Sequence, residues 1–196
     1  MTTYITSDLH LNHENILLYC PTSRGHFKDH LHMTEHIISH WNSIVQPDDE
    51  VWIVGDVSMG NPDKMHGNIS RLAGRKHLLE GNHDKKIMRD PELMRLFETI
   101  NVSVTMDING TPVRMQHHPI PVWDGKESGT VFLHGHLHST NPEVLTRRKY
   151  DVGIDGHPNF SLYILDELIA ELTKIDPTIR DIEIERPDYA KHNAKH

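Results

Sequence analysis

The sequence predicts an α/β fold with a mixed sheet, and three observations support this. Short hydrophobic runs recur along the chain, and each stops abruptly at Asp or His, which is typical of strands that end at a ligand-binding edge. Residues 29–45 carry apolar side chains with a period near 3.6 residues, as an amphipathic helix does. Asn109-Gly110 separates two further runs and is typical of a tight β-hairpin.

Strands and helices alternate through the first half of the chain. We expect strands at 2–6, 51–54 and 76–79, and helices at 14–19, 29–45, 63–72 and 91–97. Pro21 should stop the first helix, and Pro62 lies just ahead of the third. The expected apolar face of the helix at 29–45 consists of Leu31, Thr34, Ile37, Ile38, Trp41, Ile44 and Val45.

The second half contains more strand than helix. We expect the hairpin strands at 102–107 and 111–115, further strands at 130–133 and 150–154, a helix at 165–172 and a late edge strand at 179–185. Residues 119–129, rich in Pro and Gly, should form a loop over the site edge. No repeat or linker is visible. We expect one domain over residues 1–186 and a frayed tail at 187–196.

Composition limits the function classes. The 196-residue chain has a formal net charge of −8, which disfavours an extended nucleic-acid surface. No apolar run approaches the roughly 20 residues that span a bilayer, and no secretory signal is visible, so we expect no membrane partner. The single cysteine, Cys20, fits a reducing compartment, so we expect a cytoplasmic protein. The oligomeric state stays open.

Polar side chains with metal-binding capacity follow the predicted strands. Asp8 and His10 flank one residue and point to the same side of an extended segment, and Asp56 has two oxygens that can bridge two ions. This mixture of oxygen and nitrogen ligands suits Mn, Fe, Zn or Ni better than Ca, and seven ligands are about right for two ions. The candidate ligands are Asp8, His10, Asp56, Asn82, His117, His136 and His138.

Each of these residues has a simpler interpretation when taken alone. Asp and Asn favour turns, which would explain Asp8, Asp56 and Asn82 singly. Other candidates fit structural roles better. His32, His36 and His40 lie opposite the apolar face of their helix and fit a solvated surface. Packing is expected for His77, loop support for His134 and solvation for the basic run 147–149, while a structural role near the site, rather than ligation, is expected for Asp151 and Asp155.

The ordered series Asp8-x-His10, Gly55-Asp56, Gly81-Asn82-His83-Asp84, His117 and Gly135-His136-x-His138 resembles the calcineurin-like metallophosphoesterase superfamily. The resemblance implies a two-layered mixed β-sandwich flanked by helices, with two metal ions at the strand ends. It implies that the first ion is held by Asp8, His10, Asp56 and His138, and the second by Asp56, Asn82, His117 and His136. His117 is preferred to His118 because the family's ligand ends the strand.

Further residues are candidates for catalysis and substrate binding. The resemblance makes His83 the acid that protonates the leaving oxygen, and the neighbouring Asp84 is a candidate to orient His83 or raise its pKa. Asn82, His83, His13 and Arg24 are the expected substrate contacts, with Arg24 as a phosphate fork. Asn12, His118 and Trp123 are further candidates for the walls of the site.

The sequence departs from one branch of this superfamily, the Ser/Thr phosphoprotein phosphatases, at one position. Met59 stands where the Ser/Thr phosphoprotein phosphatases carry a second Asp, so the chain is more similar to small bacterial or phage phosphoesterases. We expect a phosphodiesterase acting on a small or nucleotide substrate, with two divalent ions, manganese first, and a metal-bridging hydroxide as nucleophile. The alternatives are a phosphomonoesterase, a non-catalytic binding scaffold of the same fold and a nuclease acting on DNA ends.

Overall fold

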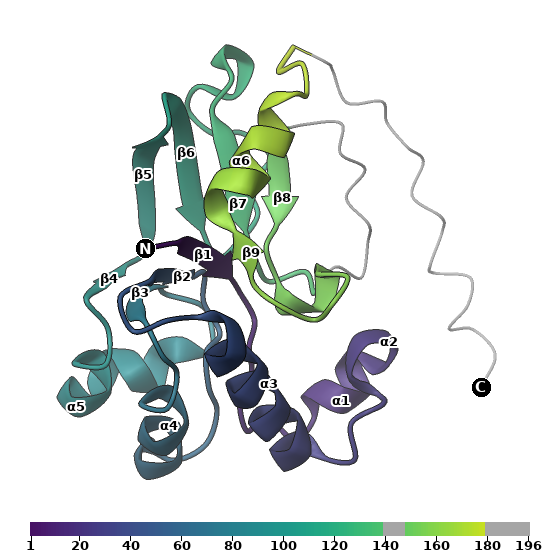
Figure 1. Cartoon of the computed structure of the whole chain (residues 1–196), viewed down its shortest axis with the longest axis vertical. Coiled ribbons are helices and arrows are strands. Elements are labelled where there is room, and N and C mark those ends of the chain that lie inside the picture. Colours follow the sequence, from purple (N-terminus) through teal and green to yellow (C-terminus); the bar gives the residue numbers. More distant parts are fainter. Residues whose placement is uncertain (139–147, 179–196) are drawn as a thin grey trace.

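Two β-sheets face each other in the computed structural model, which describes residues 1–138 and 148–178 (Figure 1). In the first sheet β1 to β4 run parallel and β9 pairs antiparallel with β1; the order is β4 (Thr99–Asn101), β3 (Arg75–Leu79), β2 (Glu50–Ile53), β1 (Thr3–Thr6) and β9 (Tyr163–Ile164). In the second, β5 and β6 form an antiparallel hairpin and β6, β7 and β8 run parallel; the order is β5 (Ser103–Ile108), β6 (Thr111–Gln116), β7 (Val131–His134) and β8 (Lys149–Asp151).

Helices flank this pair of sheets. The lower part of the view in Figure 1 holds α1 (Ile16–Tyr19), α2 (Pro21–Arg24), α3 (His30–Ile44), α4 (Pro62–Ile69) and α5 (Pro91–Met94). Helix α6 (Leu165–Thr173) packs against β1, β7 and β9. Short 3-10 turns are η1 (Asp84–Arg89), η2 (Lys126–Ser128) and η3 (Ile154–Gly156). Within the described residues, no helix combines the length and apolarity that crossing a membrane requires.

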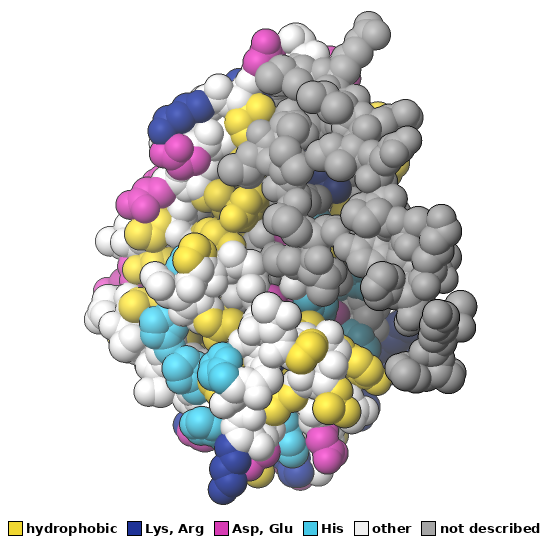
Figure 2. Space-filling view, turned by 90° about the vertical axis from the view of Figure 1, so that its right-hand side faces the viewer, with side chains coloured by type: hydrophobic (Ala, Val, Ile, Leu, Met, Phe, Trp, Pro, Cys, Tyr) yellow, Lys and Arg dark blue, Asp and Glu magenta, His cyan; other side chains and the backbone are white. Residues whose placement is uncertain are grey.

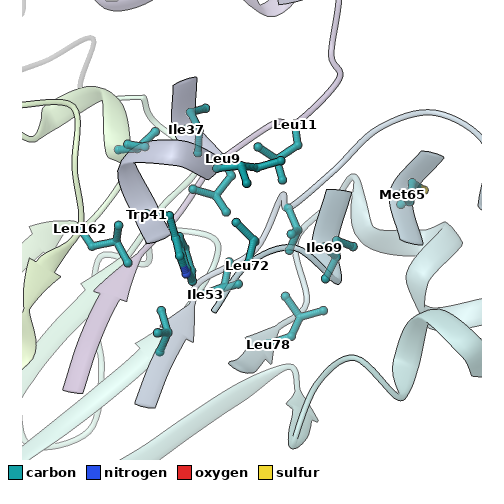
Figure 3. Packing of buried hydrophobic residues seen from close by; sticks show 14 of the residues in the cluster. Leu9, Leu11, Ile37, Trp41, Ile53, Met65, Ile69, Leu72, Leu78 and Leu162 are labelled. Carbon is teal, nitrogen blue, oxygen red and sulfur yellow. The ribbon is translucent and has the colours of Figure 1, made fainter. Parts of the chain in front are cut away.

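Alternate residues of the first sheet enter two different cores, as the pleat of a strand requires. Val51, Ile53 and Leu78 join the cluster beneath α3 and α4, whose packing around Trp41 is shown in Figure 3. Their neighbours face the second sheet and join the other cluster, which includes Trp52, Val54, Leu79, Val113, Met115, Val131 and Leu133. The predicted two-layered β-sandwich flanked by helices is therefore confirmed.

The longest predicted helix is confirmed, but its buried face differs slightly from the predicted apolar face. Helix α3 begins after Asp29, whose side chain accepts a hydrogen bond from the amide of His32 at 2.8 Å, and it ends before Val45. Leu31 was expected on the apolar face, but its side chain is 55% exposed, whereas Met33 is fully buried. Leu31 lies in the first turn, where the Asp29 cap sets the helix rotation.

The remaining predictions hold best where the local signal is strong. The Asn109-Gly110 hairpin is confirmed, but the short strands β4 and β9 were missed because each pairs through tertiary context. The strand expected at 150–154 ends at Asp151, because the chain turns at Gly153 towards Ser7. The predictions for 179–185 and 187–196 lie outside the described residues.

Candidate metal centre

The candidate ligands lie just beyond the carboxyl ends of five strands. Asp8 and His10 follow β1, Asp56 follows β2 and Asn82 follows β3, while His117 follows β6 and His136 and His138 follow β7. Because β1, β2 and β3 are parallel to one another, and β6 is parallel to β7, these ends meet at one edge of the sandwich. Side chains that are far apart in sequence therefore converge.

Backbone strain is concentrated at the same residues. Among the described residues other than glycine, eight have a positive φ, and five of these are candidate ligands: Asp8, His10, Asp56, His136 and His138. A left-handed conformation costs about 1–3 kcal/mol for such residues and is typically retained where function requires it. The strain turns each side chain from the strand direction towards the common site.

Two glycines allow the backbone to approach the ligands closely. A Cβ at Gly81 would lie 2.2 Å from Asp56 Oδ1, and a Cβ at Gly135 would lie 1.9 Å from Ser7 Oγ. Any larger residue would push the Asp56 carboxylate or the Ser7–Asp8 turn out of place. The Gly-Asn and Gly-His motifs therefore have a steric reason as well as a chemical one.

The first group of candidate ligands consists of Asp8, His10 and His138. Nε2 of His10 and Nε2 of His138 lie 3.8 and 3.7 Å from Oδ1 of Asp8. Among the described residues, neither Asp8 Oδ1 nor His10 Nε2 has a hydrogen-bond partner, although both are buried. Two orphaned buried atoms that face each other at this separation fit a shared cation.

Asp56 links this group to the second. A single atom, Asp56 Oδ2, lies 3.5 Å from His10 Nε2 and 3.4 Å from His117 Nε2. The other carboxylate oxygen, Oδ1, accepts the amide hydrogen of His83 at 2.9 Å, which fixes the orientation of the group. One oxygen thus stands between two histidines from different sheets, as a bridging ligand would.

The second group is built around His117. Its Nδ1 donates to the Val54 carbonyl oxygen at 2.8 Å, and its Nε2 points to Asn82 Oδ1 at 3.0 Å. Nε2, which faces oxygens of both Asn82 and Asp56, is the ring nitrogen that a shared cation would use. The carbonyl partner orients the ring, as the outer partners of metal-binding histidines do.

His118 also lies near this group. Its ring centre is 4.5 Å from that of His136, and the two histidines form a possible ligand group with His117. His117 is buried and directed at Asp56, whereas His118 is exposed. Of the two, His117 is the residue that faces Asp56, and His118 lies at the solvent-exposed side of the group.

The buried carboxylates and histidines of the site shift one another's pKa. Burial raises the pKa of Asp8 to about 6, against the influence of His138 and His117. Burial by itself lowers the pKa of His117 and of His138, but the carboxylates beside them prevail and raise these values to about 9 and about 10. Burial and the facing carboxylates thus act in opposite directions on the pKa of both histidines, and the carboxylates have the larger effect.

His83 and Asp84 have different surroundings. The His83 side chain is exposed, and its ring centre lies 5.3 Å from that of His10. Asp84 was expected to orient this ring. Its buried carboxylate instead accepts hydrogen bonds from the amides of Asp56, Val57 and Gly81 at 2.8–3.0 Å. Asp84 therefore fixes the loops that carry Asp56 and Asn82, and it acts on the site through the backbone.

Arg24 requires a correction. The sequence suggested a phosphate fork, but the side chain is fully buried. Its five N–H groups are matched by five acceptors: both oxygens of Asp155, the carbonyls of Asp8 and Leu9, and the sulfur of Met33. No donor remains for a substrate phosphate. Arg24 instead supports the segment that carries Asp8.

Asp155 is a contributor whose role the sequence pattern did not reveal. Its Oδ2 accepts from His138 Nδ1 at 2.8 Å, which directs Nε2 of that ring towards Asp8. Ser23 and Arg24 hold the carboxylate in place. Burial opposes its charge, but the hydrogen bonds from Arg24 and His138 keep the pKa of Asp155 far below its usual range. The structural role near the site that the sequence favoured thus takes a specific form.

The other candidates for the walls of the site divide into two classes. Nδ1 of His13 lies 3.2 Å from Nδ1 of His10, so His13 is next to a candidate ligand. Asn12 donates to the Met59 carbonyl and fixes a loop. Trp123 was considered as a site wall, but it is buried against Phe132, where its indole N–H bonds to the Thr130 carbonyl.

Comparison with known proteins identifies the class. A family model described as calcineurin-like phosphoesterase matches residues 1–187, so the chain belongs to this family. Membership indicates metal-dependent hydrolysis of phosphate esters, and the Asp and His groups described above are candidate ligands for divalent metals.

Individual relatives come from phage and archaea. The chain is 32% identical over 185 residues to the Gene 66 protein of Mycobacterium phage L5, covering 79% of this chain and 86% of that one. It is 29% identical over 188 residues to an uncharacterised protein of Methanocaldococcus jannaschii, covering 91% and 97%. A solved structure of a protein of unknown function from Aquifex aeolicus shares the fold, with a TM-score of 0.69, 23% identity and coverage of 87% and 98%.

Proposed function

We propose that this protein is a phosphodiesterase that uses two divalent metal ions and acts on a small or nucleotide substrate. The observation that carries the proposal is the position of Asp56 Oδ2, 3.5 Å from His10 Nε2 and 3.4 Å from His117 Nε2. Asp8, His10 and His138 would hold one ion with Asp56. Asn82, His117 and His136 would hold the other. The mixed oxygen and nitrogen donors suit a divalent transition metal; manganese is the preferred candidate, and iron, zinc and nickel are the alternatives.

When bound, the two ions would neutralise the charge of the phosphate and lower the pKa of the attacking water. His83 then supplies the proton that the leaving group needs. The water loses a proton to solvent, a bond forms between the resulting hydroxide oxygen and phosphorus, the bond from phosphorus to the ester oxygen breaks, and the His83 proton passes to that oxygen. The hydrogen bond from the His83 amide to Asp56 Oδ1 holds the acid beside the centre.

Substrate contacts would come from Asn82, His83 and His13. His13 is half-buried, and burial lowers its pKa, as does the neighbouring His83. Among the described residues, Figure 2 shows Lys and Arg side chains scattered over the visible face, while histidines gather in its lower half. This distribution favours a small substrate over an extended nucleic acid.

A non-catalytic scaffold of the same fold is the main alternative from another class. Such a protein has no need for the buried orphaned atoms Asp8 Oδ1 and His10 Nε2, because unpaired buried polar atoms are costly. A cation compensates both. The orphaned pair therefore favours a working metal centre.

Hydrolysis of two chromogenic esters tests the proposal. With manganese bound, we expect kcat/KM for bis-nitrophenyl phosphate to exceed that for nitrophenyl phosphate, because a monoester places an extra charge next to the buried carboxylates. Chelation of the metal should abolish both activities. A clear preference for the monoester would replace phosphodiesterase by phosphomonoesterase. Turnover confined to DNA ends would point to a nuclease, and full activity after chelation would contradict metal dependence.

The outer contact of His138 gives a second test. Asp155→Asn keeps the shape of the side chain but removes the charge that orients the ring, so manganese affinity should fall about 10–100-fold. Isothermal titration measures this affinity, and Asp48→Asn, at an exposed turn residue, is the control. Both variants are checked for folding by thermal unfolding. A folded Asp155→Asn protein that binds manganese as tightly as wild type would show that Asp155 is not a positioning residue.

A further inference from the structure

A cavity of about 370 Å³ opens directly beside the metal centre. One side is formed by His10 and His138, and the ring of His83 is part of the wall. Beyond these polar groups the lining is apolar, with Ile16, Tyr19 and Leu137. A neighbouring cavity of about 350 Å³ shares Tyr19, Cys20 and His138 with the first, so the hollow continues along α1 and α2.

The position of His83 decides which part of a substrate this cavity can take. An acid protonates the leaving oxygen from hydrogen-bonding distance, so the leaving group must occupy the space next to that acid. His83 lines this cavity together with His13, whose ring centre is 6.0 Å away. The cavity is therefore on the leaving-group side of the phosphate.

The chemistry of the lining favours an uncharged group. No Lys or Arg is among the described residues that line either cavity. Arg24, which is nearby in the chain, has no free donor. A leaving group that carried further phosphates would find no Lys or Arg side chain among these lining residues. An uncharged group could bury its apolar surface against Ile16 and Leu137.

Tyr19 adds a preference for a flat group. Its side chain is 66% exposed although it is aromatic, and it belongs to both cavities. Its ring centre lies 6.3 Å from that of His13 in an edge-on arrangement. The ring face of an exposed tyrosine at a cavity is a stacking surface for an aromatic ring or a nucleobase.

We propose that this cavity binds an uncharged aromatic leaving group, such as a nucleoside, and that Tyr19 is a specificity-determining contact for it. The proposal rests on the phosphodiesterase function argued above. It identifies which of the two ester groups of a phosphodiester the enzyme selects.

Kinetics with methyl 4-nitrophenyl phosphate test this assignment, with the nitrophenyl group as the aromatic leaving group. Tyr19→Ala should raise KM about tenfold, because a base–aromatic stack contributes about this much binding, and should leave kcat within about twofold. Tyr19→Phe should retain the wild-type KM. Leu18→Ala is the matched control, since Leu18 is the adjacent residue of α1, is 76% exposed and lines neither cavity.

A second substrate tests the charge preference. A carboxylate on the nitrophenyl ring should raise KM for the wild-type enzyme about tenfold or more. An unchanged KM for Tyr19→Ala, or equal KM values for the two esters, would overturn the cavity assignment while leaving the phosphodiesterase intact. Absence of any diester hydrolysis by the metal-loaded wild type would instead overturn the phosphodiesterase, and with it this assignment.

Discussion

Replacing Asp56 with asparagine is expected to abolish binding of both metal ions and to lower phosphodiester hydrolysis about 10³-fold or more. The Asp56 oxygen that faces both His10 and His117 would lose its charge, and each ion would lose a shared ligand. Metal ions contribute several kcal/mol to the stabilisation of such transition states, and each 1.36 kcal/mol corresponds to a factor of ten in rate. Metal content after dialysis and turnover of bis-nitrophenyl phosphate measure the two effects.

The loss of metal binding and of activity should be specific to the Asp56 carboxylate. Asp56→Asn preserves the shape and can still accept the amide hydrogen of His83, so the fold should survive. Asp48→Asn removes a carboxylate at an exposed turn and should retain both ions and full activity. An Asp56→Asn protein that still holds two ions per chain would show that Asp56 does not bridge them.

His83→Asn is expected to retain both ions and to lose about 10²–10⁴-fold in turnover, the usual contribution of a general acid. The loss should be smallest when the leaving group needs no proton. We therefore expect a modest effect on nitrophenyl esters and a large effect on alkyl esters. Steady-state rates with both classes of ester, together with metal content, measure the difference.

His118→Asn provides the control for this substitution. His118 is an exposed histidine close to the centre, at 4.9 Å between its ring centre and that of His117, and the mechanism gives it no proton-transfer step. Replacement of His118 should leave the ratio of the rates for nitrophenyl and alkyl esters unchanged. Metal loss in His83→Asn with little loss of rate per bound metal would make His83 a ligand rather than the acid.

The candidate ligands could be proposed from sequence because each belongs to a short local pattern. Asp8, Asp56 and Asn82 each follow an apolar run within three residues, and His10 lies two residues after Asp8. Parallel strands bring such ends together without any knowledge of the detailed packing. The convergence that the structure shows at Asp56 Oδ2 follows from this topology.

The roles of Arg24 and Asp155 could not be predicted in the same way. The two residues are 131 positions apart, and their pairing depends on how α2 packs against the turn after β8. Arg24 looked like a phosphate ligand only because an arginine in a loop is usually exposed. The contacts of Asp84 could not be predicted from local sequence either. Its adjacency to His83 gave no sign that its carboxylate faces three backbone amides.

Anomalous diffraction from crystals loaded with manganese tests most directly whether Asp56 joins two cations. We expect two peaks about 3.5–4 Å apart, one beside Asp8 and His138 and one beside Asn82 and His117, with Asp56 Oδ2 in contact with both. A single peak, or two peaks of which only one contacts Asp56, would contradict the dinuclear centre.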